Sequence, residues 1–204
     1  MGIGMYLTQM FFFALIFSPV IVIWRLLARK RLKKKSLKTN IFHETGLILF
    51  AAFSIGLAAL TVFPKLEFTE SGVNIMGNAL DPNRMNFIPF MLFKRMAMVK
   101  DDQQLQQMIV IFLGNILMFM PIGFFSALLW KKIKTLKILL TGTLTTLFIE
   151  IVQMFVGRET DIDDVIFNIL GVYLGYLIYL LLNKLFGSFF DKFKVTAVKT
   201  GEND

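Results

Sequence analysis

The chain has 204 residues, of which 56% are hydrophobic, and it carries a formal net charge of +8. Its mean hydropathy of +0.66 is too high for a soluble domain of this length, since such domains are usually about 45–50% apolar. It contains no cysteine, which excludes disulfides and any metal site or nucleophile built on cysteine. The excess of apolar residues indicates a protein that faces lipid.

Apolar runs long enough to cross a bilayer occur along the whole chain, because a spanning helix needs about 20 mostly apolar residues. They cover residues 3–27, 41–63, 105–130, 138–156 and 165–186. Pro19 and Pro121 lie inside the first and third runs, where we expect kinks. The sequence therefore predicts an all-α, polytopic integral membrane bundle of five transmembrane helices, formed by a single membrane domain over residues 1–204.

The basic residues gather in the connections between the apolar runs. Most of the 22 Lys and Arg residues lie in three blocks, at 25–38, 131–137 and 184–199. Five alternating spans place these blocks on one side, and an excess of positive charge marks the cytoplasmic side of a membrane. We therefore expect a multi-pass cell-membrane protein with its N-terminus outside and its C-terminus inside. This distribution also argues against a nucleic-acid partner, because the charge does not cover a folded face.

The long outer connection, residues 64–104, contains glycines and prolines that exclude one continuous helix. Its part 86–96 is apolar with two basic residues, and two interpretations stay open. This part is either a short amphipathic helix in the outer membrane interface or a folded loop that caps the bundle. The single histidine, His43, lies at the inner end of the second run, and we interpret it as interfacial.

Polar residues are concentrated around the short outer connection, residues 157–164, and the helix ends that flank it. Glu150 and Gln153 share one helix face, inside a run that otherwise looks buried in lipid, where ionisable groups are costly and usually functional. We expect a set of such residues to converge on one outward-facing polar pocket: Asn86, Asn115, Glu150, Gln153, Arg158, Asp161, Asp164 and Asn168.

Several chemistries suit such a pocket. Its carboxylates are hard oxygen ligands for a divalent cation, and a Glu150 in apolar surroundings suits acid–base work. Arg158 suits a phosphate or a carboxylate, including that of a lipid head group. The structural alternative is a salt bridge between Arg158 and an aspartate that fixes the loop.

The start of the last apolar run carries signals of its own. Asp161 or Asp163 is expected to cap the helix there, because free N–H groups at a helix start favour an anion. Gly171 and Gly175 form a GxxxG pair, which we interpret as a site of close helix packing.

Three segments carry a recognisable motif. They are Asn-x-x-Pro-Phe at 86–90, Asn-x-x-x-Phe-x-Pro-x-Gly at 115–123, and Glu-x-x-Gln at 150–153 followed by Arg-x-x-Asp-x-Asp-Asp-x-x-x-Asn-x-x-Gly at 158–171. In this order they resemble the VanZ-like family of membrane proteins, and the resemblance extends over residues 86–179.

The resemblance implies a bacterial cell-membrane protein. The founding member of the family is associated with low-level resistance to the glycopeptide teicoplanin, and relatives with reduced sensitivity to lipoglycopeptides. We therefore favour an envelope factor whose pocket binds membrane lipids, a lipid-linked cell-wall precursor or a lipoglycopeptide. Two alternatives stay open: an intramembrane enzyme that modifies a phospholipid or cell-wall lipid, and an ion-coupled transporter, although no inverted repeat is visible.

Overall fold

The protein is mainly helical over the residues that the structure describes. The computed structural model describes residues 3–34, 37–62, 66–69, 72–75, 78–130 and 134–197. Four of the helices in these ranges are long and apolar enough to cross a membrane, and a bent pair near the N-terminus supplies a fifth span if it is counted as one. The expectation of a multi-pass helical protein is therefore confirmed. Some predicted positions lie outside the described residues: Lys35, Phe63, Lys131, Lys132 and Lys199.

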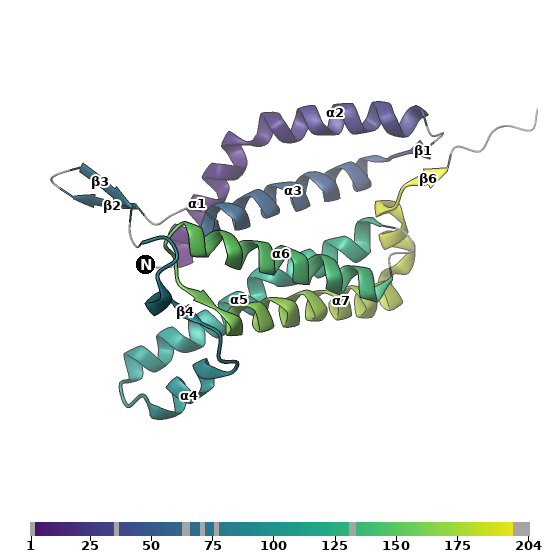
Figure 1. The fold of residues 1–204 in the computed structure, drawn as a ribbon. Coiled ribbons are helices and arrows are strands. Elements are labelled where there is room, and N and C mark those ends of the chain that lie inside the picture. Colours follow the sequence, from purple (N-terminus) through teal and green to yellow (C-terminus); the bar gives the residue numbers. More distant parts are fainter. Residues whose placement is uncertain are drawn as a thin grey trace, which may run out of the picture.

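The first predicted span is bent. It consists of α1 (Ile3–Ile16) and α2 (Ser18–Lys34), which meet at an angle of 54°. The break falls beside Pro19, whose ring and missing N–H disfavour an uninterrupted helix, so the kink expected there is confirmed. α1 packs against α3 (Ile41–Thr61), and α2 runs beside α3 toward the basic end of the molecule (Figure 1).

Three long helices complete the bundle. They are α5 (Asp102–Leu129), α6 (Thr135–Phe155) and α7 (Ile162–Phe190). α5 and α7 share the most extensive helix contact in the described structure, and α6 packs on α7. α5 runs through Pro121 as a single helix.

Glycines allow α5 and α7 to approach each other at backbone distance. A Cβ added to Gly171 would lie 2.2 Å from the carbonyl oxygen of Ile116. A Cβ added to Gly175 would lie 1.9 Å from the carbonyl oxygen of Met120. The GxxxG pair of α7 thus lies at a helix contact where any side chain would push the two backbones apart.

Short elements close both ends of the bundle (Figure 1). At one end β4 (Met85–Asn86) pairs in parallel with β5 (Thr160–Asp161), and α4 (Met91–Met98) follows β4. At the opposite end β1 (Leu37–Lys38) pairs with β6 (Thr196–Ala197). The described parts of the three basic blocks lie at this second end, as alternating spans require. The long connection also contains the hairpin of β2 (Leu66–Thr69) and β3 (Gly72–Ile75) and a 3-10 helix at Pro82–Arg84.

Candidate functional site

The predicted polar residues lie at the end of the bundle that carries β4, β5 and α4. α6 ends at Phe155 and α7 begins at Ile162, so the chain reverses within a few residues. The parallel pairing of β4 with β5 sets Asn86 opposite Asp161, although the two are far apart in the sequence. This pairing brings the Asn-x-x-Pro-Phe segment to the start of α7.

Asn86, Asp161 and Glu150 form one hydrogen-bonded chain. The Nδ2 of Asn86 donates to Oδ1 of Asp161 at 2.8 Å, and the backbone N–H of Asp161 donates to Oε2 of Glu150 at 3.3 Å. Glu150 is only 6% exposed, and Asp161, Asp164 and Arg158 all lie close enough to interact with its charge. The charged residues of the predicted pocket therefore gather around the Glu150 carboxylate.

The acidic residues at the start of α7 accept hydrogen bonds from the backbone of different helices. Asp161 is the N-cap of α7, and its Oδ1 accepts a hydrogen bond from the backbone N–H of Asp163 at 2.9 Å. The Asp163 carboxylate points instead to α4, where it accepts hydrogen bonds from the backbone N–H groups of Phe90 and Leu92. Asp161 and not Asp163 is therefore the cap of the last helix.

Asp163 is the residue that sequence reasoning left out of the site. It is 1% exposed, and it meets the free amides at the start of α4, where the helix dipole favours a negative charge. Phe90, immediately before α4, has a left-handed φ of 62°, and its N–H donates to this carboxylate. The sequence contained one indication of this role. Successive residues of a helix face different ways, so the side chains of Asp163 and Asp164 had to contact different elements.

The remaining predicted residues link the long helices to one another. Three side-chain hydrogen bonds do this: Asn115 of α5 to Asp164 of α7, Asn168 of α7 to Thr146 of α6 at 2.8 Å, and Gln153 of α6 to the Thr61 carbonyl of α3 at 3.1 Å. Thr146 is fully buried and was not selected from the sequence. The side-chain oxygens of Gln153 and Asn168 are buried without a hydrogen-bond partner among the described residues. These polar groups therefore fix helix positions around the Glu150 site.

A cavity of about 120 Å³ opens beside Glu150. Its polar lining comes from Glu150, Thr160 and Asp161, and the rest of its wall is apolar. Phe87 and Ile151, which also line it, are 63% and 52% exposed, so the cavity opens on the apolar side of the bundle. Glu150 and Asp161 thus lie in the wall of this cavity, whose exposed lining is almost entirely apolar.

The loop between α6 and α7 is held from both sides. The backbone N–H of Arg158, which is half-buried, donates to the carbonyl of Gln153 at 3.0 Å. The guanidinium of Arg84, from the long connection, donates to the carbonyl of Gly157 at 3.1 Å. The long connection therefore helps to fix the loop that carries Arg158 and Asp161.

The arrangement of acidic residues does not form a metal centre in the described part of the chain. No group of three or more His, Asp or Glu side chains there is placed to hold a metal ion. The divalent cation considered from the sequence therefore has no ready set of side-chain ligands within those ranges.

α4 combines the two interpretations that were open for residues 86–96. Leu92 is buried against the bundle, and Phe93 packs edge-on against Phe167 of α7. Lys94 and Arg95 are exposed. α4 is thus a short amphipathic helix that also covers the end of the bundle.

The fold is a bundle of apolar helices with a buried carboxylate at one end, and it defines the class of protein: a multi-pass membrane protein with a polar site at a helix terminus. The family model described as VanZ/LLP1 matches residues 50–183, and the chain belongs to this family. The match includes all three of the motif segments. Neither the comparison with curated proteins nor that with solved structures gave a match.

Proposed function

We propose that the protein is a bacterial cell-membrane factor that lowers sensitivity to teicoplanin or lipoglycopeptides by binding a lipid or lipid-linked cell-wall component. The observation that carries this proposal is the Glu150–Asp161 pair in the wall of a cavity open to the apolar side of the bundle. Apolar pockets with a few well-placed polar groups are typical of small-ligand sites. At about 120 Å³ the cavity suits one polar group of a ligand whose apolar part lies along the bundle surface.

The polar groups around the cavity suit a ligand rich in hydrogen-bond donors. Carboxylates accept hydrogen bonds, and they accept stronger ones than neutral groups do, so Glu150 and Asp161 suit hydroxyl, amide or amine groups. Arg158, close to Glu150, adds a donor for a phosphate. Sugars, peptides and phosphates are the components of lipid-linked cell-wall material.

The cavity faces outward in the orientation that we propose, with the N-terminus outside the cell and the C-terminus inside. The basic residues at the opposite end support it, because positive charge is retained on the cytoplasmic side. α4, an amphipathic helix with Lys94 and Arg95 exposed, suits a membrane interface on either side. Phe87, just before α4, lines the cavity and connects this interface with Glu150.

The test is the teicoplanin inhibitory concentration of a sensitive bacterium that expresses the protein. Wild type is expected to raise it, while Glu150→Gln and Asp161→Asn are expected to abolish the increase, because each removes a charged acceptor from the cavity. Glu159→Gln is the matched control, since it removes one negative charge from an exposed position in the same loop. Equal inhibitory concentrations for wild type and both cavity variants, at equal protein levels, would exclude the cavity as the active part.

A catalytic role is the second candidate, because a buried carboxylate that faces a cavity is also the arrangement of a general acid or base. Mass spectrometry of membrane lipids distinguishes the two candidates. A lipid species that appears with wild type and not with Glu150→Gln would establish an enzyme, and identical lipid profiles would leave the binding factor. Flux into proteoliposomes that depends on a pH or ion gradient would instead support the transporter alternative.

A further inference from the structure

A second and larger cavity lies at the basic end of the bundle, opposite the Glu150 site. It has a volume of about 310 Å³ and lies between α2, α3 and the end of α5. Arg25, Arg31 and His43 supply its polar lining, and Trp24 and Trp130 supply large aromatic surfaces. The proposed function makes no use of this cavity.

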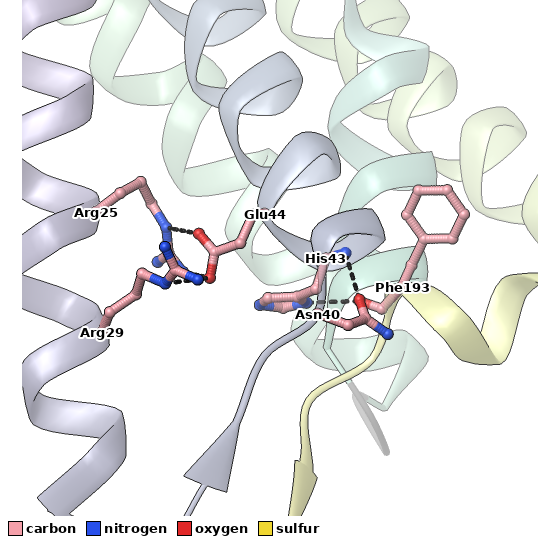
Figure 2. Close-up of polar contacts among 6 residues, drawn as sticks. All are labelled: Arg25, Arg29, Asn40, His43, Glu44 and Phe193. Carbon is pink, nitrogen blue, oxygen red and sulfur yellow. Dashed lines mark hydrogen bonds and ion pairs between the residues drawn. The ribbon is translucent and has the colours of Figure 1, made fainter.

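One wall of the cavity contains a buried ion pair that carries surplus positive charge. Nε and Nη2 of Arg25 donate to the two carboxylate oxygens of Glu44, each at 2.9 Å, and these side chains are 8% and 9% exposed. Nε of Arg29 lies 3.5 Å from the same carboxylate, as Figure 2 shows. One negative charge therefore faces two guanidinium groups, which leaves a net positive charge in this wall.

Arg31 adds a further positive charge at the mouth of the cavity. It is exposed, and no carboxylate of the described residues lies within ion-pair distance of it. A cavity lined by this arginine, beside a wall of net positive charge, attracts an anion, and guanidinium groups match the geometry of a phosphate.

His43 offers one more polar atom from α3. It is 5% exposed, so its side chain is enclosed by the protein at the end of the bundle where the sequence places it. Its Nδ1 is hydrogen-bonded to the carbonyl oxygen of Phe193, and because a carbonyl can only accept, Nδ1 carries the hydrogen. The other ring nitrogen, Nε2, lies on the side of α2 (Figure 2) and is available to a ligand.

The two tryptophans place the cavity at the level of lipid head groups. They are the only tryptophans of the chain, both line the cavity, and they are 48% and 47% exposed. Tryptophan is enriched at the membrane–water interface, where its ring lies at head-group depth. The neighbouring surface of α2 exposes Ile23 and Leu27, which suits acyl chains.

We propose that this cavity binds the phosphate head group of an anionic phospholipid in the leaflet at the basic end of the bundle. Arg31 binds the phosphate, Nε2 of His43 contacts the head group, and the tryptophans flank the glycerol region. The Arg25–Glu44 pair holds α2 against α3 so that the arginines face the cavity. A volume of about 310 Å³ is at the lower limit of small-molecule sites, roughly 300–1,000 Å³, and therefore suits a head group rather than a whole lipid.

The tryptophans also provide the assay. The full-length protein is placed in nanodiscs of phosphatidylcholine and phosphatidylglycerol in which only one of the two lipids carries brominated acyl chains, and quenching of tryptophan fluorescence is compared. Brominated phosphatidylglycerol is expected to quench about tenfold more effectively at equal mole fraction. This factor corresponds to the free energy of about one charge-assisted hydrogen bond. The preference is expected to disappear in the Arg31→Gln variant.

Lys30→Gln is the matched control, because it removes one positive charge from an exposed position of α2 that does not line the cavity. It is expected to retain the preference. Equal quenching of wild type by both lipids would overturn the proposal, because it shows no preference for the anionic lipid. A loss in Lys30→Gln as large as in Arg31→Gln would overturn it too, because it indicates an effect of general surface charge. A fluorescence response to inorganic phosphate in pure phosphatidylcholine, without any preference between the lipids, would assign the site to a soluble phosphate instead.

Discussion

Asp163 is predicted to hold α4 on the bundle, and its removal is expected to release α4 while the rest of the protein stays folded. The carboxylate accepts hydrogen bonds from the backbone N–H groups of Phe90 and Leu92. Apart from the β4–β5 pair, it is the main polar link between the long connection and the start of α7. Asp163→Ala removes both acceptors and leaves the two amides without a partner in the docked state.

The size of the effect follows from these two hydrogen bonds. A hydrogen bond to a charged group contributes about 1.5–3 kcal/mol, so the loss of two destabilises docked α4 by at least about 3 kcal/mol. An opening reaction that becomes easier by this amount exchanges its amide hydrogens about 100-fold faster. Asp163→Asn retains one acceptor oxygen and is expected to give an intermediate increase.

Hydrogen exchange measured by mass spectrometry on peptides that cover residues 86–98 tests this prediction. Exchange in α6 and in the second half of α7 is expected to stay at the wild-type rate, because the glycine-mediated contact of α5 with α7 is untouched. Asp102→Asn, an acidic residue in the first turn of α5, is the control and should leave residues 86–98 protected. Unchanged exchange of these peptides in Asp163→Ala, or an equal increase throughout the bundle, would refute the reasoning.

Two further predictions concern the interior of the bundle. Gly175→Ala is expected to lower the free energy of unfolding by about 1–3 kcal/mol, because its Cβ would meet the Met120 backbone. Gly114→Ala is the control: a Cβ there has nothing within 4 Å, so the free energy of unfolding should stay the same or rise by about 0.5–1 kcal/mol. Thermal unfolding in detergent compares the two variants. Glu44→Leu is expected to destabilise the protein by about 3–5 kcal/mol, because it leaves the buried charge of Arg25 unpaired. Arg25→Met is expected to cost less, because Arg29 remains 3.5 Å from the Glu44 carboxylate, and the double variant should recover most of the loss of Glu44→Leu. Additive losses in that cycle would show that the pair is not coupled.

The membrane class, the approximate spans and the family could be predicted from the sequence, because they depend on local properties. Hydropathy over about 20 residues reports whether a helix suits lipid, and motif spacing needs no tertiary information. The bend at Pro19 was predictable for the same reason, since proline affects its own helix. The gathering of charge around Glu150 was anticipated because Glu150, Arg158 and Asp161 are close along the chain.

Contacts between distant segments could not be predicted in this way. Asp163 and Asp164 are neighbours with the same side chain, and only the docking of α4 shows that Asp163 serves Phe90 and Leu92. Similarly, the sequence showed Gln153 and Asn168 as polar residues in apolar runs, but in the structure their side chains form hydrogen bonds between different pairs of helices. A side chain's partner is set by the position of every helix that surrounds it, which hydropathy does not contain.

The basic end shows the same difference between features that are local in the sequence and contacts that need the tertiary structure. The sequence by itself determined that three blocks of positive charge lie on one side of a membrane protein, because alternation of spans and charge are both properties of the linear chain. Only the tertiary structure decided that Glu44 joins Arg25 in a buried pair, that His43 is buried against Phe193, and that both tryptophans surround one cavity. These contacts join α2, α3 and the ends of α5 and α7, and their geometry exists only once the helices have packed.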